Sequence, residues 1–188
     1  MRSVILASSS PRRKQLLEQI KLPFTAVPSN VQEDVKAFHC SPFEVAEQLS
    51  LLKASEVAER FKKEIVIGAD TIVVIDNEIL GKPKDDSEAC QMLTRLSGRE
   101  HEVITGVSLI NIERNIKMVE HESTKVKFRK LTSRMIESYV KSKEPADKAG
   151  AYAIQGLGAL FVERIEGCYF NVVGLPLARL NMMLEKIH

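Results

Sequence analysis

The sequence predicts a mixed α/β protein with α+β character, built around a long, twisted, mixed sheet. In the first half, short β-branched apolar runs alternate with segments that have the apolar spacing of helices. In the second half, long consecutive strand-like segments are joined by short turns. Because these hairpins interrupt the alternation of strand and helix, a regular doubly wound sheet is not expected.

The chain begins with a short strand over residues 3–7, followed at once by a helix. Ser10 is a typical N-cap, and Pro11 suits the first helical position. The apolar residues that follow have helical spacing, and the helix is expected to end before Pro23. Between this helix and residue 65 we expect a strand over residues 24–27, a polar loop over 29–38 and a long helix over 41–61.

The central stretch, residues 65–75, reads as a buried strand that contains one acid, Asp70. A carboxylate in apolar company is costly to bury unless a cation meets it. A hairpin turn near Asp76 and Asn77 would return the chain toward this strand and deliver Lys82. We therefore predict that Asp70 and Lys82 face each other across a site for a phosphorylated, metal-bearing ligand. The alternative is that Asp70 is a strand-end residue satisfied by a turn or a helix cap.

The second half begins with a helix over residues 85–96, for which Ser87 is a candidate cap. Two long strands over 103–112 and 117–128 follow, and after them a helix capped by Thr132 and a glycine-rich loop over residues 147–158. The last expected elements are strands over 159–165 and 168–172 and a helix after Pro176.

Positive side chains occupy the first turn of the helix that begins at Pro11. Arg12, Arg13 and Lys14 lie where the helix macrodipole is already positive, and each such charge costs about 0.3–1 kcal/mol. A bound anion would reverse this cost, because backbone N–H groups, the hydroxyls of residues 8–10 and two guanidinium groups would converge on it. We predict a phosphate site here; the alternative is that the arginines point into solvent.

Composition limits the function classes. The 188 residues suit one large domain or two small lobes, and 44% apolar with 28% charged residues is typical of a globular protein. With a net charge of +2 and 5% aromatic residues we expect no nucleic-acid partner. No apolar run approaches the roughly 18 residues of a membrane span. Three widely separated cysteines, and no segment that reads as a signal peptide, favour the cytoplasm.

The candidate residues fit phosphoanhydride chemistry best. The four histidines are expected in a loop, at strand edges and at the C-terminus, so no Ser-His-Asp triad is expected. Lysines and arginines with a few carboxylates suit a phosphate ligand with Mg²⁺ or Mn²⁺, while a carboxylate orients water. The candidates are Ser8, Ser9, Arg12, Arg13, Glu33, Lys53, Asp70, Lys82, Asp147, Lys148 and Gln155.

Six short motifs occur in order along the chain: Ala7-Ser8-Ser9-Ser10-Pro11-Arg12-Arg13, Gly68-Ala69-Asp70-Thr71, Gly81-Lys82-Pro83, Asp147-Lys148-Ala149-Gly150-Ala151-Tyr152, Gln155-Gly156 and Gly174-Leu175-Pro176. Taken together, they resemble the Maf family of nucleoside triphosphate pyrophosphatases. The resemblance runs from about Ser3 to the final helix.

The resemblance implies a single domain over residues 1–188, with the two-lobed architecture of inosine triphosphate pyrophosphatases and an active groove between the lobes. It implies attack of water at the α-phosphorus, giving nucleoside monophosphate and pyrophosphate. Asp70 matches the family's proton acceptor and is also expected as a metal ligand, with Glu33. Lys53 and Lys82 are expected in catalysis, and Lys148 with Ser8, Ser9, Arg12 and Arg13 in substrate binding.

Arg12, Thr71 and Gln155 match the branch of the family that acts on dTTP and UTP. The amide of Gln155 would pair with the O4 and N3–H of a pyrimidine. Two alternatives stay open: a pyrophosphatase for another modified nucleotide such as 7-methyl-GTP, and a non-enzymatic nucleotide-binding regulator of septum formation. The resemblance also suggests a homodimer.

Overall fold

The computed structural model describes residues 4–31, 38 and 40–187. Its strands are β1 (Val4–Leu6), β2 (Phe24–Ala26), β3 (Ile65–Ile75), β4 (Glu78–Leu80), β5 (Glu100–Asn111), β6 (Ile116–Phe128) and β7 (Val162–Glu166). Its helices are α1 (Pro11–Gln19), α2 (Pro42–Ala58), α3 (Asp86–Leu96), α4 (Ser133–Lys141), α5 (Tyr169–Val173) and α6 (Leu177–Glu185), with the 3₁₀ helices η2 (Glu144–Asp147), η3 (Ala149–Ala151) and η4 (Gly156–Phe161).

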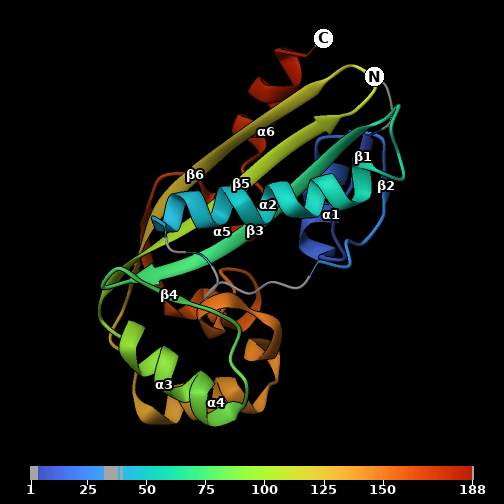
Figure 1. Cartoon of the computed structure of the whole chain (residues 1–188). Helices are drawn as coiled ribbons and strands as arrows, with labels where there is room; N and C mark the ends of the chain where they lie inside the picture. The colour runs from blue at the N-terminus through green and yellow to red at the C-terminus, as the bar shows by residue number, and fades with distance from the viewer. Residues whose placement is uncertain (1–3, 32–37, 39, 188) are drawn as a thin grey trace. The chain divides into compact units, whose positions relative to one another are not determined.

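Within the described residues, seven strands form one mixed sheet (Figure 1). The order is β2-β1-β3-β5-β6-β7, and β4 pairs with β3 outside this path. β1 pairs in parallel with both β2 and β3, whereas β4 pairs antiparallel with β3, and β7 with β6. The predicted mixed α/β class is therefore confirmed.

The chain divides into two compact units, and their boundaries fall inside β3, β5 and β6. Unit 1 comprises Met1–Asp70, Thr105–Glu122 and Gly174–His188, and unit 2 comprises Thr71–Ile104 and Ser123–Val173. The two lobes that the resemblance implied thus correspond to two compact units. Each unit has its own buried core.

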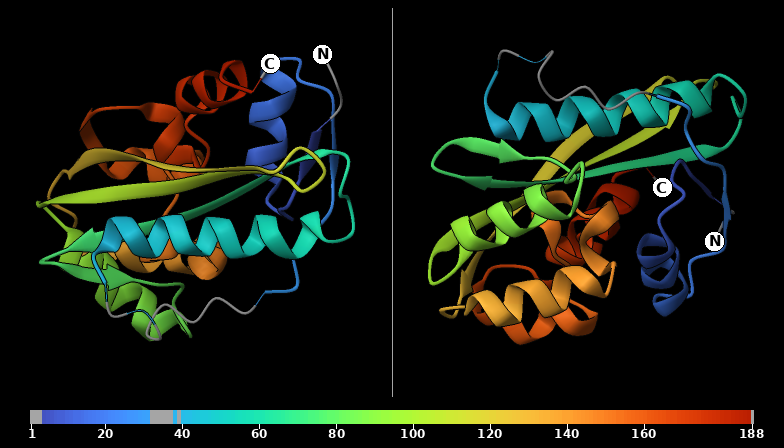
Figure 2. Two further views of the ribbon diagram at one scale, coloured as in Figure 1. Left: turned by 45° about the horizontal axis from the view of Figure 1, so that its top comes forward. Right: turned by 90° about the horizontal axis from the view of Figure 1, so that it is seen from below.

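In unit 1, helices cover both faces of the sheet: α2 lies on one face, and α1 and α6 lie on the other (Figure 2). The sequence explains where α1 and α2 begin, because each has a capping residue. Ser10 caps α1, with its Oγ 3.5 Å from the N–H of Arg13. Ser41 and Glu44 form a capping box at α2, in which each side chain accepts a hydrogen bond from the other residue's N–H.

In unit 2, the core is rich in aromatic rings. Phe128 lies in the middle of this cluster, with edge-on contacts to His101, Tyr152 and Phe161 at centroid distances of 4.9, 4.7 and 5.9 Å. Edge-to-face pairs at these distances are favourable beyond their area of contact. His101 was expected at a strand edge, but it is 4% exposed inside β5, so that expectation was wrong.

The predicted strand over residues 168–172 was also wrong, because Tyr169–Val173 is the helix α5. The run is rich in aromatic and β-branched residues and has strand propensity, but tertiary hydrogen bonds override it. Asn171 Nδ2 donates to the carbonyl of Val103 at 2.9 Å and to Thr124 Oγ1 at 3.0 Å. Thr124 also bonds both the N–H and the carbonyl of Cys168.

Two smaller expectations need correction. The strand predicted from residue 159 begins at Val162, because η4 occupies the preceding residues and a carboxylate, that of Glu144, holds its first N–H groups. The cap of α3 is Asp85 rather than Ser87: Asp85 Oδ1 accepts from the N–H of Glu88 at 2.8 Å. Ser87 is already inside the helix.

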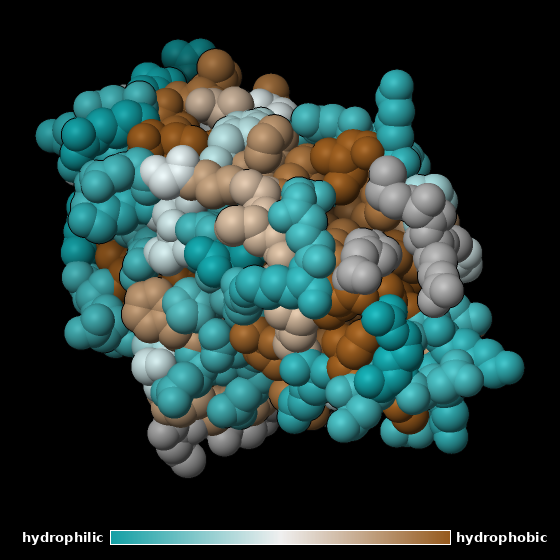
Figure 3. All heavy atoms as spheres, turned by 90° about the horizontal axis from the view of Figure 1, so that it is seen from above, coloured by the Kyte–Doolittle hydropathy of each residue, from teal (hydrophilic) through white to brown (hydrophobic). Residues whose placement is uncertain are grey.

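On the face drawn in Figure 3, hydrophobic patches alternate with hydrophilic side chains. Across residues 4–31, 38 and 40–187, every helix is too short or too polar to cross a bilayer.

Candidate active site

The carboxyl ends of β1 and β3 are the part of unit 1 that brings candidate residues together. The chain goes from β1 through α1 to β2 on one side, and then through α2 to β3 on the other side of β1. Ligands of open α/β sheets bind at such a switch point, outside the carboxyl ends of the strands. Leu6 of β1 pairs with Ile67 of β3. Ser8 and Ser9, which follow β1, therefore begin at the same level of the sheet as the part of β3 that leads to Asp70.

Arg13 is held at this edge by a buried network. Its Nε donates to the carbonyl of Gly174 at 2.8 Å, and its Nη1 donates to Ser8 Oγ at 3.2 Å. The same Oγ accepts from the N–H of Ser10 at 3.2 Å. Both Arg13 and Ser8 are buried, whereas Ser9 is exposed and Arg12 half-buried. The alternative in which both arginines point into solvent is therefore wrong for Arg13.

Gly174 explains one motif that sequence reasoning had quoted without a role. Its φ is +126°, which an L side chain rarely adopts. This conformation presents the carbonyl that holds the Arg13 guanidinium. The motif therefore fixes a basic side chain at the first turn of α1, in the turn that contains no acidic residue.

Asp70 and Lys53 form a buried ion pair in unit 1. Lys53 Nζ bonds Asp70 Oδ1, and each side chain is 9% exposed. The expectation that Lys53 acts in catalysis came from the family resemblance, because a lone lysine in a helix is usually solvated and gives no such signal by itself. The alternative that a turn or a cap satisfies Asp70 is wrong, since the partner that the structure records is a lysine.

Two glycines bring the helix of Lys53 close to the sheet. A Cβ on Gly68 of β3 would lie 2.2 Å from the carbonyl oxygen of Ser50, and one on Gly106 of β5 would lie 2.1 Å from that of Ala46. Ala46 and Ser50 are one helical turn apart, so they lie on the same face of α2, and this face contacts the backbone of the sheet at Gly68 and Gly106. This close approach lets a long side chain from the same region of α2 reach Asp70.

The second oxygen of Asp70 has a different environment. Among the described residues, Lys53 is the partner recorded for Oδ1, and Oδ2 accepts no hydrogen bond from them. One oxygen is thus held by the protein, and the other keeps its capacity to accept from a ligand.

Five candidates belong to unit 2: Thr71, Lys82, Asp147, Lys148 and Gln155. Thr71 continues β3, Lys82 follows β4, Lys148 lies between η2 and η3, and Gln155 directly precedes η4. Lys148 is largely buried and pairs with Asp147, whereas Lys82 is exposed. Within the described chain the side chain of Gln155 makes no hydrogen bond, which leaves its amide available to a ligand. The expected meeting of these residues with Asp70 stays a prediction.

The expected metal site stays a prediction. Glu33 lies outside the described residues. The residues that are described contain no cluster of three or more His, Cys, Asp or Glu side chains suited to an ion. Mg²⁺ usually takes only one or two carboxylates and completes its shell with water and substrate phosphates. Asp70 Oδ2 fits that pattern as one protein ligand.

Sequence reasoning missed two polar groups that position the glycine-rich segment. Glu144 accepts from Tyr139 Oη at 2.9 Å and from the N–H groups of Leu157 and Gly158 at 3.1 and 3.2 Å. It lies between α4 and Pro145. The spacing of Glu144 from the glycines gave no signal, since its partners come from tertiary contact.

The second missed group is the pair of His101 and Tyr152. His101 Nε2 and Tyr152 Oη are 2.7 Å apart in the aromatic core. Burial lowers the pKa of His101 to about 3, so the ring is neutral near pH 7. Burial, and then the neighbouring Tyr139, raise the pKa of Tyr152. The pair ties the end of the Asp147–Tyr152 motif to β5.

Comparison with known proteins places the whole chain in one family. The model of the family described as Maf-like protein matches residues 3–187. A protein named dTTP/UTP pyrophosphatase from Ruminiclostridium cellulolyticum is 56% identical over 188 residues, covering 100% of this chain and 97% of that protein. One of the same name from Clostridioides difficile is 50% identical over 184 residues, covering 98% and 94%.

Among solved structures, a nucleoside-triphosphatase / dITP/XTP pyrophosphatase from Mycobacterium abscessus aligns with a TM-score of 0.47 and 14% identity, covering 69% of this chain and 76% of that one. That likeness is too low to support an argument about fold or activity. The family match and the full-length relatives are sufficient by themselves, and they agree with the six motifs. This chain belongs to the Maf-like protein family.

Proposed function

We propose that this chain is a nucleoside triphosphate pyrophosphatase that converts dTTP and UTP into nucleoside monophosphate and pyrophosphate. The observation that carries the proposal is 50–56% identity over essentially the whole chain to relatives named dTTP/UTP pyrophosphatase. We also propose that residues 1–188 act as one functional domain. The family match over residues 3–187 supports this.

The first turn of α1 would bind the phosphates. α1 starts with backbone N–H groups that have no partner within the helix, and its first turn holds basic but no acidic residues. Arg13 is already oriented by Gly174 and Ser8, so little ordering entropy would be lost on binding. Ser9 and Arg12, which are more exposed, would complete the phosphate contacts.

Asp70 would orient the attacking water and take up its proton. Its Oδ1 is held by Lys53, which fixes the direction of the carboxylate, and its Oδ2 accepts no hydrogen bond from the described residues. An oriented carboxylate of this kind supplies positioning and general-base assistance. Lys53 would act through Asp70, and we propose that Lys82 and Lys148 neutralise charge on the phosphates.

A divalent cation, Mg²⁺ or Mn²⁺, would be held by Asp70 Oδ2, with Glu33 proposed as a further ligand. It would polarise the phosphate oxygens and offset their charge. Thr71 and Gln155 would contact the nucleoside. The unpaired amide of Gln155 can both donate and accept, which matches the O4 and N3–H edge of uracil and thymine.

A nucleotide panel tests the proposal. Pyrophosphate release is measured with dTTP, UTP, dCTP, dATP, dGTP and 7-methyl-GTP, with Mg²⁺, with Mn²⁺ and with EDTA. We expect dTTP and UTP to exceed the others in kcat/KM by at least about tenfold, which is 1.4 kcal/mol of discrimination. A preference for 7-methyl-GTP, or no preference, would overturn the assignment of the base.

Asp70→Asn separates an enzyme from a binding protein. The variant keeps the shape of the side chain but loses the base, so we expect kcat to fall by about 10²–10⁴-fold. If this variant abolishes hydrolysis while any effect on septum formation persists, nucleotide binding rather than turnover carries the cellular role. The family resemblance also suggests a cytoplasmic homodimer, which sedimentation of the purified protein would test.

A further inference from the structure

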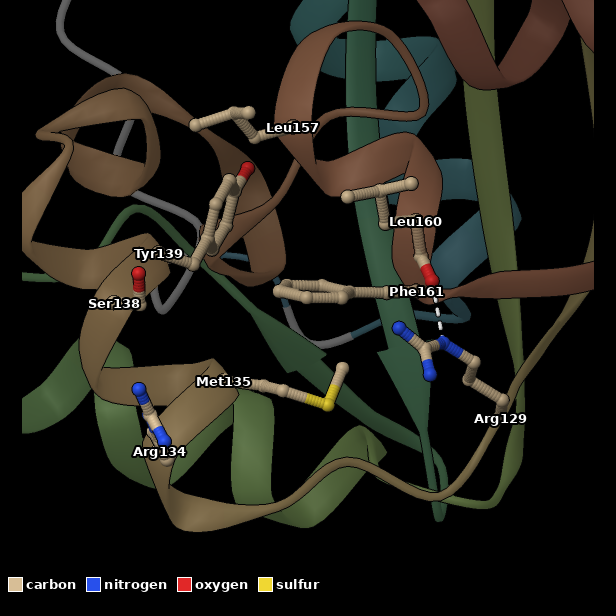
Figure 4. Close-up of a pocket in the computed structure, with 8 residues that line it drawn as sticks. All are labelled: Arg129, Arg134, Met135, Ser138, Tyr139, Leu157, Leu160 and Phe161. Atoms are coloured by element: carbon tan, nitrogen blue, oxygen red, sulfur yellow. Dashed lines mark hydrogen bonds between the residues drawn. The ribbon is translucent and has the colours of Figure 1, made fainter.

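A cavity of about 320 Å³ lies in unit 2 between α4 and η4, and none of the residues proposed for nucleotide hydrolysis lines it (Figure 4). Its inner wall is apolar: Met135 and the ring of Tyr139 come from α4, and Phe161 comes from the end of η4. Tyr139 and Phe161 are each 3% exposed, so their rings form a fixed wall. We call this feature the α4–η4 cavity.

The hydroxyl on the inner wall, that of Tyr139, is already used, and the other hydroxyl of the lining belongs to exposed Ser138. Tyr139 Oη donates to Glu144 at 2.9 Å and accepts from the N–H of Ala153 at 3.3 Å. A ligand with a polar buried edge, such as a nucleotide base, would lose its hydrogen bonds to water without replacing them. The α4–η4 cavity therefore favours an apolar group.

Two leucines beside the cavity extend its apolar surface outward. Leu157 is 52% exposed and Leu160 is 64% exposed. Their backbone is fixed: Glu144 accepts from the N–H of Leu157, and the carbonyl of Leu160 accepts from Arg129 Nε at 2.6 Å. Exposed apolar side chains on an ordered backbone bind with little further loss of entropy.

The charged side chains of the lining are both positive. Arg129 and Arg134 both line the cavity, on different sides of it (Figure 4). Arg129 uses its Nε for the carbonyl of Leu160, and its outer nitrogens make no hydrogen bond with the described residues. Arg134 makes no hydrogen bond or ion pair with any described residue. Two cations beside an apolar hollow complement a ligand that joins an apolar group to carboxylates.

We propose that the α4–η4 cavity docks a segment of another protein in which a large apolar side chain is flanked by acidic residues. The apolar side chain would fill the cavity, the carboxylates would meet Arg129 and Arg134, and the segment's backbone would cover Leu157 and Leu160. A small amphiphile inside the cavity would leave those leucines exposed. A short segment buries less than the roughly 1,200 Å² of a stable interface, so the contact is of micromolar strength. The proposal does not depend on nucleotide hydrolysis.

Fluorescence anisotropy with defined peptides tests it, using the full-length protein without nucleotide. The probe is a fluorescein-labelled peptide of sequence Gly-Asp-Glu-Leu-Phe-Glu-Asp-Gly. One control replaces Leu-Phe by Ser-Ser, and the other replaces the four acidic residues by lysine. We expect the first peptide to bind at least tenfold more tightly than either control, and this binding to weaken as salt rises from 50 to 300 mM.

Matched variants locate the site. Arg134→Glu and Leu160→Ser should each weaken binding at least tenfold. Lys141→Glu makes the same charge change at an exposed position of α4 outside the cavity, and Leu52→Ser removes a comparably exposed leucine in unit 1; both should bind like the wild type. Unchanged circular dichroism melting curves show that the variants are folded.

Three results would overturn the proposal. The first is equal binding by the wild type and Arg134→Glu, and the second is equal or tighter binding of the lysine peptide. The third is a change of the sedimentation coefficient in Leu160→Ser without peptide, because the surface would then be covered by a second copy of this chain.

Discussion

The two units position their candidate residues by different physical means. In unit 1, packing does it: bare backbone at Gly68 and Gly106 seats α2 on the sheet, and the buried pair of Lys53 and Asp70 follows from that contact. In unit 2, hydrogen bonds do it: Glu144 and the pair of His101 and Tyr152 hold the segment that carries Lys148 and Gln155.

The difference teaches where each unit should be sensitive to mutation. Packing against backbone leaves no room for relaxation, so small volume changes in unit 1 should have large effects. A hydrogen-bonded segment depends instead on whether each buried polar atom keeps its partner. The four predictions below test this contrast, from the largest expected effect to the smallest.

Lys53→Met should have the largest effect on stability. It removes the cation from a buried carboxylate, and breaking such a pair costs about 3–5 kcal/mol of unfolding free energy. Urea denaturation measures the change. The double variant Lys53→Met/Asp70→Asn removes both charges and should recover most of the loss. If the double variant is as unstable as Lys53→Met, the cost comes from packing rather than from the unpaired charge.

Gly68→Ala should destabilise by about 1–3 kcal/mol, the usual cost of overpacking. The new Cβ would meet the carbonyl oxygen of Ser50 at 2.2 Å, so α2 has to move away from β3. The same movement should lower kcat, because it carries Lys53 away from Asp70. Gly81→Ala in unit 2 is the matched control for stability, since a Cβ there meets nothing within 4 Å.

The pH dependence of stability should reveal His101. Its pKa is lowered from 6.5 to about 3, so between these values the unfolded chain binds a proton that the folded protein does not. The free energy of unfolding should therefore decrease as the pH falls below 6.5, by up to about 1.4 kcal/mol per pH unit.

The control for this pH effect is His101→Phe/Tyr152→Phe, which removes both members of the hydrogen bond and keeps two aromatic rings in the core. Urea denaturation at pH 5.0, 5.5, 6.0 and 6.5 should show a shallower slope for the double variant. Equal slopes in the two proteins would mean that His101 is already protonated in the folded state.

Arg164→Gln should have the smallest effect, below about 0.5 kcal/mol. Arg164 pairs with Glu100 at 3.4 Å in unit 2, but the two side chains are 66% and 40% exposed. Exposed pairs gain little because water screens them. The comparison with Lys53→Met shows how far burial, rather than the presence of an ion pair, decides the effect. A loss above 2 kcal/mol would contradict this reasoning.

Sequence reasoning located most of the elements, because caps, turns and apolar spacing are local signals. Ser10, Ser41 and Thr132 each cap the helix that was expected after them. It failed where partners are distant in the chain. The residues from Cys168 onward have strand propensity, and the helix there depends on contacts with Thr124 and Val103.

For the candidate site, the same distinction holds. The motifs identified Arg13 and Asp70 as candidates, and the structure gives both of them buried, specific partners. Lys53 looked like an ordinary helix lysine, since nothing in its neighbours announces a carboxylate 17 residues later in the chain. Glu144 and His101 were overlooked for the same reason.

The amino-acid sequence alone determined the family, the mixed α/β class and the types of residue available for chemistry, because motifs, caps and hydrophobic periodicity are written in neighbouring positions. Only the tertiary structure decided that Asp70 pairs with Lys53, that His101 is kept neutral, and that Arg134 lies beside the α4–η4 cavity without a partner among the described residues. These depend on burial and on pairs brought together from distant segments, and burial sets the energy of a charge far more than its place in the chain does.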